Sequence, residues 1–397
     1  MVAKSNNQQL LEKFSRTTEE IFSIDELKRK LESGKQLKIK YGVDVTAPTL
    51  HIGHAVNLWM LREMQDMGHK VQFLVGDFTT QIGDPTGKNK LRPMIDKLEI
   101  EKNIQAFIDS VKTVLRFDDP NLLEIRRNSE WFDQMSLAEF LKLLSMVTHS
   151  RLISRDMFKK RIQESSDIYM HEMLYPILQG YDSFMLESDL TIVGSDQLFN
   201  EMLGRFYQER LGQSPQVVLT TKVTPGIDGK EKQSKSIGNY IGLAHTPQDK
   251  FGRIMSIPDN LIISYLEVYT TVSLDEINDL KEKVKQDPMA CKKFLAEKIV
   301  ERYHGTEVAV QERKWFEETF SSKKTPDNLT IIKISTIETL FDAVLSYFGN
   351  KKTNSEIKRL FSQNAISQNG NKVSDFKVLV ASGDIIKIGK RDWFKIE

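Results

Sequence analysis

The sequence has a single cysteine, Cys291, in 397 residues, and it has no run of about 18 apolar residues. One cysteine can form neither a disulfide framework nor a cysteine-based zinc site, which fits a reducing compartment. Residues 1–22 lack the apolar core of a secretory leader. We therefore expect a cytoplasmic protein with no membrane span.

An excess of charge of one sign is also missing, since 56 Lys and Arg residues face 55 Asp and Glu residues, for a net charge of +1. This total excludes a generally basic surface, but it leaves room for a local basic patch that binds RNA. The sequence is 40% hydrophobic and 28% charged, which is typical of a packed globular protein. Its length predicts two or three domains.

The most informative segment is 37–68. Residues 37–43 have the partly alternating polarity of a strand, and the turn residues of 44–48 end it. After His51-Ile52-Gly53-His54, apolar residues recur at helical spacing. A strand that leads into a helix N-terminus favours phosphate binding, because free backbone N–H groups and the helix dipole point at the anion. On this motif alone, two ordinary surface histidines remain the alternative.

A second strand is predicted at 71–78, so the region has the strand–helix–strand order of a parallel βαβ unit. The glycine-rich turn 83–88 follows, with Lys88 and Arg92 in or just beyond it. It lacks the GxxxxGK[ST] spacing of a Walker loop. Either it is a solvated loop, or it approaches phosphate at the end of a strand.

The rest of the first half predicts further helices and one strand. The pattern indicates helices at 8–34, 97–115 and 137–146, a strand at 122–127, and an irregular basic segment at 149–165.

Residues 167–186 predict a largely apolar helix that carries a polar stripe. Tyr175, Gln179 and Asp182 stand at i, i+4 and i+7, so they share one face. Three polar groups in an apolar setting are costly unless they meet polar partners. They either face a polar ligand or brace neighbouring elements.

A second strand-to-helix turn is predicted at Gly194-Ser195-Asp196-Gln197, after a short strand at 189–193. Its glycine permits close approach, and its carboxylate suits the vicinal hydroxyls of ribose. Another strand at 217–219 precedes loop 223–239, which contains Lys232 and Lys235. The loop is either a solvated run of charge or a mobile clamp on a triphosphate, and its position after a nucleotide-type turn favours the clamp.

The last third of the sequence no longer shows the alternating strands and helices of the first part. Residues 246–320 predict helices only, and a linker follows at 321–333. Residues 336–397 predict a separate module with helices at 341–348 and 354–363 and short strands near 373 and 383–394. Ten basic residues against seven acidic ones give this module a net charge of +3.

These motifs resemble class I aminoacyl-tRNA synthetases, and within them the bacterial tyrosyl-tRNA synthetase family. The resemblance covers almost the whole sequence and is carried by KxGxDxTAP with HIGH, GDFT, IGDPTGK, LYPxxQGYDS, GSDQ and KQSKSIGNYIG. The tail resembles a small RNA-binding domain shared with a small-subunit ribosomal protein and several RNA-modifying enzymes. The resemblance implies an α/β fold with a Rossmann-like parallel-sheet catalytic domain at 1–240, an all-helical anticodon-recognition domain at 241–325, and a small α+β RNA-binding domain at 336–397.

The family's reaction implies the partners L-tyrosine, ATP and tRNA(Tyr), Mg²⁺ carried on phosphate without a dedicated protein site, and a homodimer. By matching positions, the catalytic residues that contact phosphate would be His51, His54, Lys88, Arg92, Lys232 and Lys235. Those that bind tyrosine would be Asp44, Thr79, Asp84, Tyr175, Gln179, Asp182 and Gln197. Those that bind ATP would be Thr46, His51, Gly53, His54, Gly194, Asp196 and Lys235.

Four positions depart from the family pattern. Lys40 stands where the better-known branch has a tyrosine that shares the contact with the substrate phenol, and Val45 replaces a usual proline. Thr80 replaces a usual glycine, and we expect it to narrow the amino-acid pocket. Gln233 replaces the methionine of KMSKS. None of these changes removes a charge that the chemistry needs.

Two other functions stay open at this point. A tryptophanyl-type class I synthetase shares the phosphate machinery, and the polar stripe at 175, 179 and 182 favours tyrosine over it. A non-charging RNA-binding paralogue, or a small-molecule nucleotidyltransferase on the same fold, is the second alternative. The retained histidines and loop lysines favour a charging enzyme.

Overall fold

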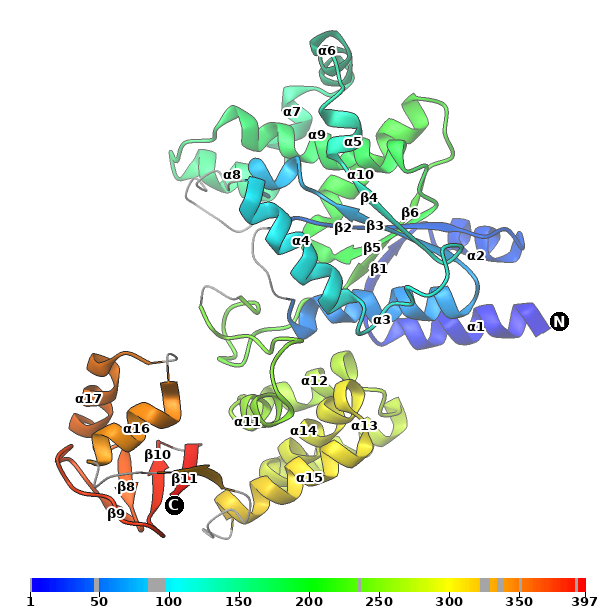
Figure 1. The fold of residues 1–397 in the computed structure, drawn as a ribbon. Coiled ribbons are helices and arrows are strands. Elements are labelled where there is room, and N and C mark those ends of the chain that lie inside the picture. The colour runs from blue at the N-terminus through cyan, green and yellow to red at the C-terminus, as the bar shows by residue number, and fades with distance from the viewer. Residues whose placement is uncertain are drawn as a thin grey trace. The chain divides into compact units, whose positions relative to one another are not determined.

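A computed structural model describes residues 2–45, 50–84, 97–234, 237–321, 329–333, 339–349, 352–389 and 392–397. Contacts within the chain divide it into two compact units, Met1–Glu312 and Arg313–Glu397 (Figure 1). Among the residues that the structure describes, none of the helices is long and apolar enough to cross a membrane.

The first unit is built on a six-stranded sheet with the order β1-β6-β5-β2-β3-β4. Its strands are β1 (Thr18–Phe22), β2 (Lys38–Val43), β3 (Lys70–Val75), β4 (Leu123–Arg127), β5 (Leu190–Gly194) and β6 (Val217–Thr221). All neighbouring strands are parallel except β1, which is antiparallel to β6. The predicted Rossmann-like parallel sheet is therefore confirmed.

The strand order reverses between β2 and β5. The chain moves from β2 through β3 to β4 in one direction and from β5 to β6 in the other. Because such crossovers are right-handed, the two directions place α3 (Ile52–Asp66) and α10 (Leu198–Arg210) on opposite faces of the sheet (Figure 1). In open α/β sheets, ligands bind outside the carboxyl ends of the strands at this reversal. Asp44, which directly follows β2, and the turn at 194–197, which follows β5, both lie there.

The sheet is covered on both faces, which explains why its inner strands read as nearly continuous apolar runs. Five of the six residues of β3 and all five of β6 are buried. Helix α9 (Met170–Met185) packs along α10. The remaining elements between β3 and β5 are η1 (Thr79–Gln81), α4 (Lys97–Val111), α5 (Ser129–Phe132), α6 (Leu137–Ser145), α7 (His149–Ile153) and α8 (Asp156–Gln163).

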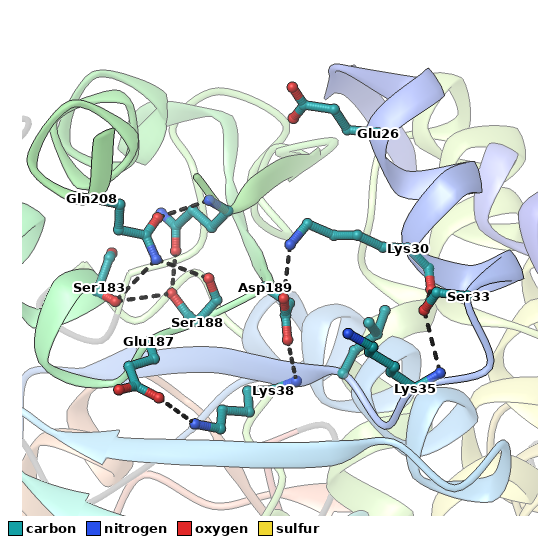
Figure 2. A network of polar contacts seen from close by, with 12 residues as sticks. Glu26, Lys30, Ser33, Lys35, Lys38, Ser183, Glu187, Ser188, Asp189 and Gln208 are labelled. Atoms are coloured by element: carbon teal, nitrogen blue, oxygen red, sulfur yellow. Dashed lines mark hydrogen bonds and ion pairs between the residues drawn. The ribbon is translucent and has the colours of Figure 1, made fainter. Parts of the chain in front are cut away.

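Side chains at the amino ends of β2 and β5 join these strands to α2 (Ile24–Glu32), as Figure 2 shows. Asp189 accepts hydrogen bonds from the Lys30 ammonium at 2.7 Å and from the backbone N–H of Lys38 at 3.0 Å. The Lys38 ammonium pairs with Glu187 at 2.7 Å. These contacts hold the end of the two strands that lies opposite the reversal edge.

Two predictions of local structure were wrong. The helix expected at 8–34 is α1 (Val2–Ser15), then β1, then α2. Strand β1 is an exposed edge strand with the polar sequence TEEIF, and its partner β6 lies about 200 residues further along the chain, so local periodicity could not reveal it. The segment expected to be irregular at 149–165 contains α7 and α8, whose Leu152 and Phe158 are buried.

The helical part of the chain confirms the prediction of helices alone, because the described residues 246–321 contain no strand. Its elements are α11 (Pro247–Met255), η3 (Asp259–Leu261), α12 (Ile262–Tyr269), α13 (Leu274–Gln286) and α14 (Pro288–His304). Helix α15 (Thr306–Phe316) and the π-helix η4 (Glu317–Ser321) lead into the second unit. Helix α12 packs against α3, so the helical part contacts the helix that begins at the histidine motif.

The second unit is a small α+β module. Its sheet has the order β7-β11-β10-β8-β9 and is formed by β7 (Thr330–Ile332), β8 (Ile366–Gln368), β9 (Asn371–Lys372), β10 (Ile385–Ile388) and β11 (Asp392–Ile396). Helices α16 (Leu340–Phe348) and α17 (Asn354–Ser362) pack on it around Ile357, Phe361 and Phe394. Both predicted helices are confirmed, and capping boxes at Thr339 and Thr353 fix where they begin.

Candidate active site

His51 and His54 lie together at the N-terminus of α3. His51 is the extended residue before the helix, and its backbone N–H donates to Nδ1 of His54 at 3.3 Å. The two ring centroids are 3.8 Å apart. A Cβ atom at Gly53 would stand 2.9 Å from the His51 ring, so glycine is what lets the ring lie this close to the helix start. The structure therefore gathers two imidazoles beside the positive end of a helix.

The segment that follows loop 223–239 pairs with this motif. The backbone N–H of Ile52 donates to Ile241 O at 2.9 Å, and that of Leu243 donates to Leu50 O at 2.8 Å. His51 and Gly242 form an isolated antiparallel bridge. The exit of the lysine loop is therefore attached to the beginning of α3.

The same loop reaches the second turn. Lys232 Nζ lies 2.9 Å from Asp196 Oδ2, in the turn η2 (Ser195–Gln197) that follows β5. Both side chains are partly exposed, so the pair is easily exchanged for a ligand. A Cβ atom at Gly194 would stand 2.8 Å from Asp196 Oδ1. The structure thus brings together one loop lysine and the predicted ribose-binding carboxylate.

Asp44, which directly follows β2, is hydrogen-bonded to two other residues of the predicted tyrosine site. It accepts a hydrogen bond from Thr79 Oγ1 at 2.9 Å and another from the Tyr175 hydroxyl at 3.0 Å. Burial, with the Asp44 charge beside it, raises the pKa of Tyr175 well above its usual value. The phenol therefore stays neutral and acts as a donor to Asp44.

Asp182 is 3% exposed and lies one helical turn beyond Gln179 on α9. Trp131 Nε1 donates to its Oδ1 at 3.0 Å, and Asn128 Nδ2 lies 3.5 Å from its Oδ2. Burial raises the pKa of Asp182 to about 8, against the opposing effect of the Lys40 charge. The result is a buried carboxyl group whose ionisation is held close to neutral pH.

Asn128 and Trp131 were not among the predicted site residues. Asn128 also donates to Thr79 Oγ1 at 3.0 Å, so it links the Asp182 and Asp44 groups. Its position in the sequence could have identified Asn128 as a site residue, because it comes directly after β4 at the carboxyl edge of the sheet.

A third set of hydrogen-bonded side chains in the site contains Asp84, Gln197 and Gln179. Gln197 Nε2 donates to Asp84 Oδ2 at 2.8 Å, and Asn200 Nδ2 bridges Gln197 Oε1 at 3.1 Å and Gln179 Oε1 at 2.7 Å. Gln179 Nε2 donates to Glu201 Oε1 at 2.8 Å. Asn200 and Glu201 are fully buried and were also missed by the sequence analysis.

Arg155 adds a buried positive charge that the sequence analysis did not single out. It is 6% exposed, directly before α8. Burial lowers the pKa of its guanidinium, while the carboxylates of Asp84 and Asp196 oppose this shift. Its charge therefore interacts both with Asp84 of the predicted tyrosine site and with Asp196 of the predicted ribose site.

The four departures from the family pattern have partners in the structure. Lys40 is 1% exposed and pairs with Glu201 at 2.8 Å. Thr80 Oγ1 accepts from the backbone N–H of Val45 at 3.0 Å and donates to Gly76 O at 2.6 Å, so it braces the turn after β2. Gln233 is buried and bonds to Tyr269 in α12.

Four predicted residues, Thr46, Lys88, Arg92 and Lys235, lie outside the described residues, so their placement stays a prediction. Among the described residues, no group of three or more His, Cys, Asp or Glu side chains is arranged to hold a metal ion. What the structure does bring to one edge of the sheet is imidazole, carboxylate, amide and ammonium groups.

Comparison with known proteins places this chain in a family. Residues 32–321 match the family model of tRNA synthetases class I (W and Y). A tyrosine–tRNA ligase of Oleidesulfovibrio alaskensis is 39% identical over 393 residues, which cover 98% of each chain. Another from Thermotoga maritima is 39% identical and covers 96% of this chain and 95% of its own. The chain belongs to the class I tRNA synthetases of the tryptophan and tyrosine group, a family that uses ATP.

Solved structures share the fold. A C-terminally truncated mitochondrial tyrosyl-tRNA synthetase from Aspergillus nidulans matches with a TM-score of 0.63 and 23% identity, covering 78% of this chain and 94% of its own. A tyrosyl-tRNA synthetase from Archaeoglobus fulgidus, complexed with L-tyrosine, matches with a TM-score of 0.58 and 22% identity, covering 77% and 99%.

Proposed function

We propose that this chain is a tyrosine–tRNA ligase, which activates L-tyrosine with ATP to tyrosyl-adenylate, releases pyrophosphate, and transfers tyrosine to the 3′ end of tRNA(Tyr). The full-length bacterial relatives are named for this activity. The structural observation that carries the proposal is Asp182, a buried carboxyl group on the same helix face as Tyr175 and Gln179. A buried acceptor of this kind is what a site for a phenol needs.

We assign the tyrosine hydroxyl to Asp182. With tyrosine bound, the phenol and the carboxyl group satisfy one another. With phenylalanine in its place, the buried carboxyl group loses that partner, and leaving a buried polar group unpaired costs about 1–3 kcal/mol or more. The substrate's amino group would meet Asp84, Tyr175 and Gln179, close to Asp44 and Gln197. Thr79 completes this tyrosine site through its bond to Asp44.

The ATP site would lie along the same edge of the sheet. His51 and His54 would contact phosphate at the start of α3, with Gly53 permitting the approach, and Gly194 and Asp196 would hold the ribose. The pyrophosphate group would be surrounded by Lys88, Arg92, Lys232 and Lys235, with Thr46 nearby. Mg²⁺ would be carried by the ATP phosphates rather than by a protein cage, and it would supply positive charge that offsets the phosphate charge.

The chemistry of the first step fits these residue types. The carboxylate of tyrosine is ionised at neutral pH, so its attack on the α-phosphate of ATP needs no general base. Catalysis then consists of positioning the two substrates and stabilising the charge that develops on the leaving pyrophosphate. Imidazole, ammonium and guanidinium groups provide that stabilisation.

Three further assignments rest on the family resemblance. The helical domain at 241–325 would recognise the anticodon, and the domain at 336–397 would bind RNA through its excess of positive charge. We also propose a homodimer, supported by Leu137 and Leu141 on α6, which are 72% and 55% exposed one turn apart. The single cysteine favours a cytoplasmic location.

The test is ATP–pyrophosphate exchange with tyrosine, tryptophan and phenylalanine, followed by charging of tRNA(Tyr). We expect exchange and charging with tyrosine alone. Exchange with tryptophan would identify the chain as the tryptophanyl type. Exchange with no amino acid, together with retained binding of tRNA, would identify the non-charging paralogue.

A further inference from the structure

A buried ion pair lies beneath the predicted tyrosine-binding residues, and so far only the effect of the Lys40 charge on the pKa of Asp182 has been described. Lys40 in β2 and Glu201 in α10 are each 1% exposed, and Lys40 Nζ lies 2.8 Å from Glu201 Oε2. Lys40 also donates to Ser183 Oγ at 2.7 Å, and it lies 3.4 Å from Gln179 O. Lys40 is therefore occupied by the protein itself, rather than held ready for the substrate phenol.

The close approach of α9 and α10 is what joins this pair to the polar stripe. A Cβ atom at Gly180 would stand 2.9 Å from Leu203 Cβ, and one at Gly204 would stand 2.5 Å from Ser183 Oγ. Two glycines therefore let the helices pack with their backbones close together. As a result the side chain of Gln179, on α9, reaches Glu201 on α10.

Glu201 is the start of a chain of amides that ends at Asp84. Gln179 donates to Glu201, Asn200 donates to Gln179 and to Gln197, and Gln197 donates to Asp84. Both ends of this chain are carboxylates, which accept hydrogen bonds and cannot donate them while they are ionised. The nitrogens of the two glutamine amides must therefore face the two carboxylates, and their oxygens must face Asn200. Both N–H groups of Asn200 donate to those oxygens.

The direction of the chain is set by the Glu201 carboxylate, which accepts at both oxygens and pairs with Lys40 at 2.8 Å. Gln216 Nε2 occupies Glu201 Oε2 at 2.9 Å, which leaves Oε1 for Gln179. An amide at position 201 would still accept from Gln216 with its oxygen, and it would then turn an N–H group toward Gln179. The Gln179 amide would have to reverse, and its N–H group would face the donor of Asn200.

This arrangement is not the one that stability alone would select. Among the described residues, the Asn200 carbonyl oxygen is buried and has no hydrogen-bond partner. An unpaired buried acceptor costs about 1–3 kcal/mol, and such groups are concentrated where function requires them. A buried ion pair is also poor evidence of stabilisation, since well-packed apolar residues often serve as well.

We propose that Lys40 and Glu201 are positioning residues of the tyrosine site: their ion pair fixes the orientation of the Gln179 and Gln197 amides and so sets the affinity for tyrosine. An ammonium group only donates, so it is bound by amide oxygens and repelled by amide N–H groups. The orientation of Gln179 decides which of the two the substrate's amino group meets. This inference rests on the proposed function, and it names residues that act through others without touching the substrate.

Two variants test the proposal. Glu201→Gln removes the charge that directs the amides but leaves Lys40 buried and unpaired, so its melting temperature is expected to fall. The double variant Lys40→Met with Glu201→Gln removes both charges of the pair and is expected to regain stability. Both are expected to raise the KM for tyrosine about tenfold or more, which is the range of a hydrogen bond to a charged group. The KM for ATP is expected to stay within about twofold.

Lys30→Met is the matched control. It removes an ion pair from Asp189, directly before the amino end of β5 and so away from the site, and is expected to lower the melting temperature without changing either KM (Figure 2). A double variant that regains both stability and the parental KM for tyrosine would overturn the positioning role, as would equal increases in both KM values. No tyrosine-dependent exchange in the parent chain would overturn the proposed function, and the positioning role with it.

Discussion

The side-chain amide of Gln233 donates a hydrogen bond to the Tyr269 hydroxyl at 2.8 Å, and its oxygen accepts from the backbone N–H of Ile241 at 3.1 Å. Gln233 stands in the lysine loop, while Tyr269 ends α12 of the helical part. A Cβ atom at Gly53 would stand 3.8 Å from Gln233 Nε2. One buried amide therefore joins the loop, the histidine motif and the helical part.

Gln233→Met is expected to raise the KM for ATP several-fold and to leave the KM for tyrosine unchanged. Methionine fills the space but leaves the Ile241 N–H and the Tyr269 hydroxyl with one partner fewer, so the loop is held less well over the nucleotide. Tyr269→Phe removes the same bond from the other side, together with the bond between the hydroxyl and Thr224. The double variant is expected to lose less than the sum of the two single variants, because the two share one interaction. Fully additive effects in steady-state kinetics would contradict this coupling.

Asp182→Asn is expected to make thermal stability less dependent on pH. Because the pKa of Asp182 is about 8 in the folded chain and close to 4 when unfolded, the folded state holds this proton more tightly between those values. The stability that protonation provides is complete below pH 4 and is lost as the pH rises toward 8, at up to about 1.4 kcal/mol per pH unit. The melting temperature of the variant relative to the parent should therefore rise from pH 5 to pH 8. Parallel profiles over this range would contradict the shifted pKa.

His54→Ala is expected to slow adenylate formation by about 10²–10³, equivalent to about 2.7–4 kcal/mol, with little change in the KM for tyrosine. The imidazole lies at the N-terminus of α3, where a fixed donor can stabilise charge on phosphate without rearranging. The measurement is the rate of pyrophosphate exchange at saturating tyrosine and ATP. His149→Ala, which changes an exposed histidine at the start of α7, should match the parent. A variant at position 54 with the parental rate would exclude His54 from the catalytic group.

Leu137→Glu combined with Leu141→Glu is expected to convert the proposed dimer into monomers and to abolish charging. Both leucines are largely exposed on one face of α6, so two carboxylates there would repel their counterparts across a symmetric interface. Sedimentation velocity gives the oligomeric state, and circular dichroism checks that the fold is kept. Leu98→Glu is the control, because Leu98 is also 72% exposed but lies on α4. A double variant that remains dimeric would place the interface elsewhere.

The sequence by itself was enough to locate the start of α3 at His51 and the turn at 194–197. Glycine, histidine and aspartate at the ends of short apolar runs mark turns. Such turns can be predicted because neighbouring residues decide the local backbone geometry. For the same reason the helices at 340–348 and 354–362 could be predicted closely, since their capping residues are part of the local sequence. The stripe of Tyr175, Gln179 and Asp182 follows from helical periodicity alone.

Only the tertiary structure decided which partners those residues have. Trp131 and Asp182 are 51 residues apart, Gln233 and Tyr269 are 36 apart, and Lys40 lies on strand β2 while Glu201 lies on helix α10. Such contacts depend on the order of the strands and on how closely α9 and α10 approach, and no local pattern encodes either. The edge strand β1 was missed for the same reason, because its pairing energy comes from a distant strand rather than from its own residues.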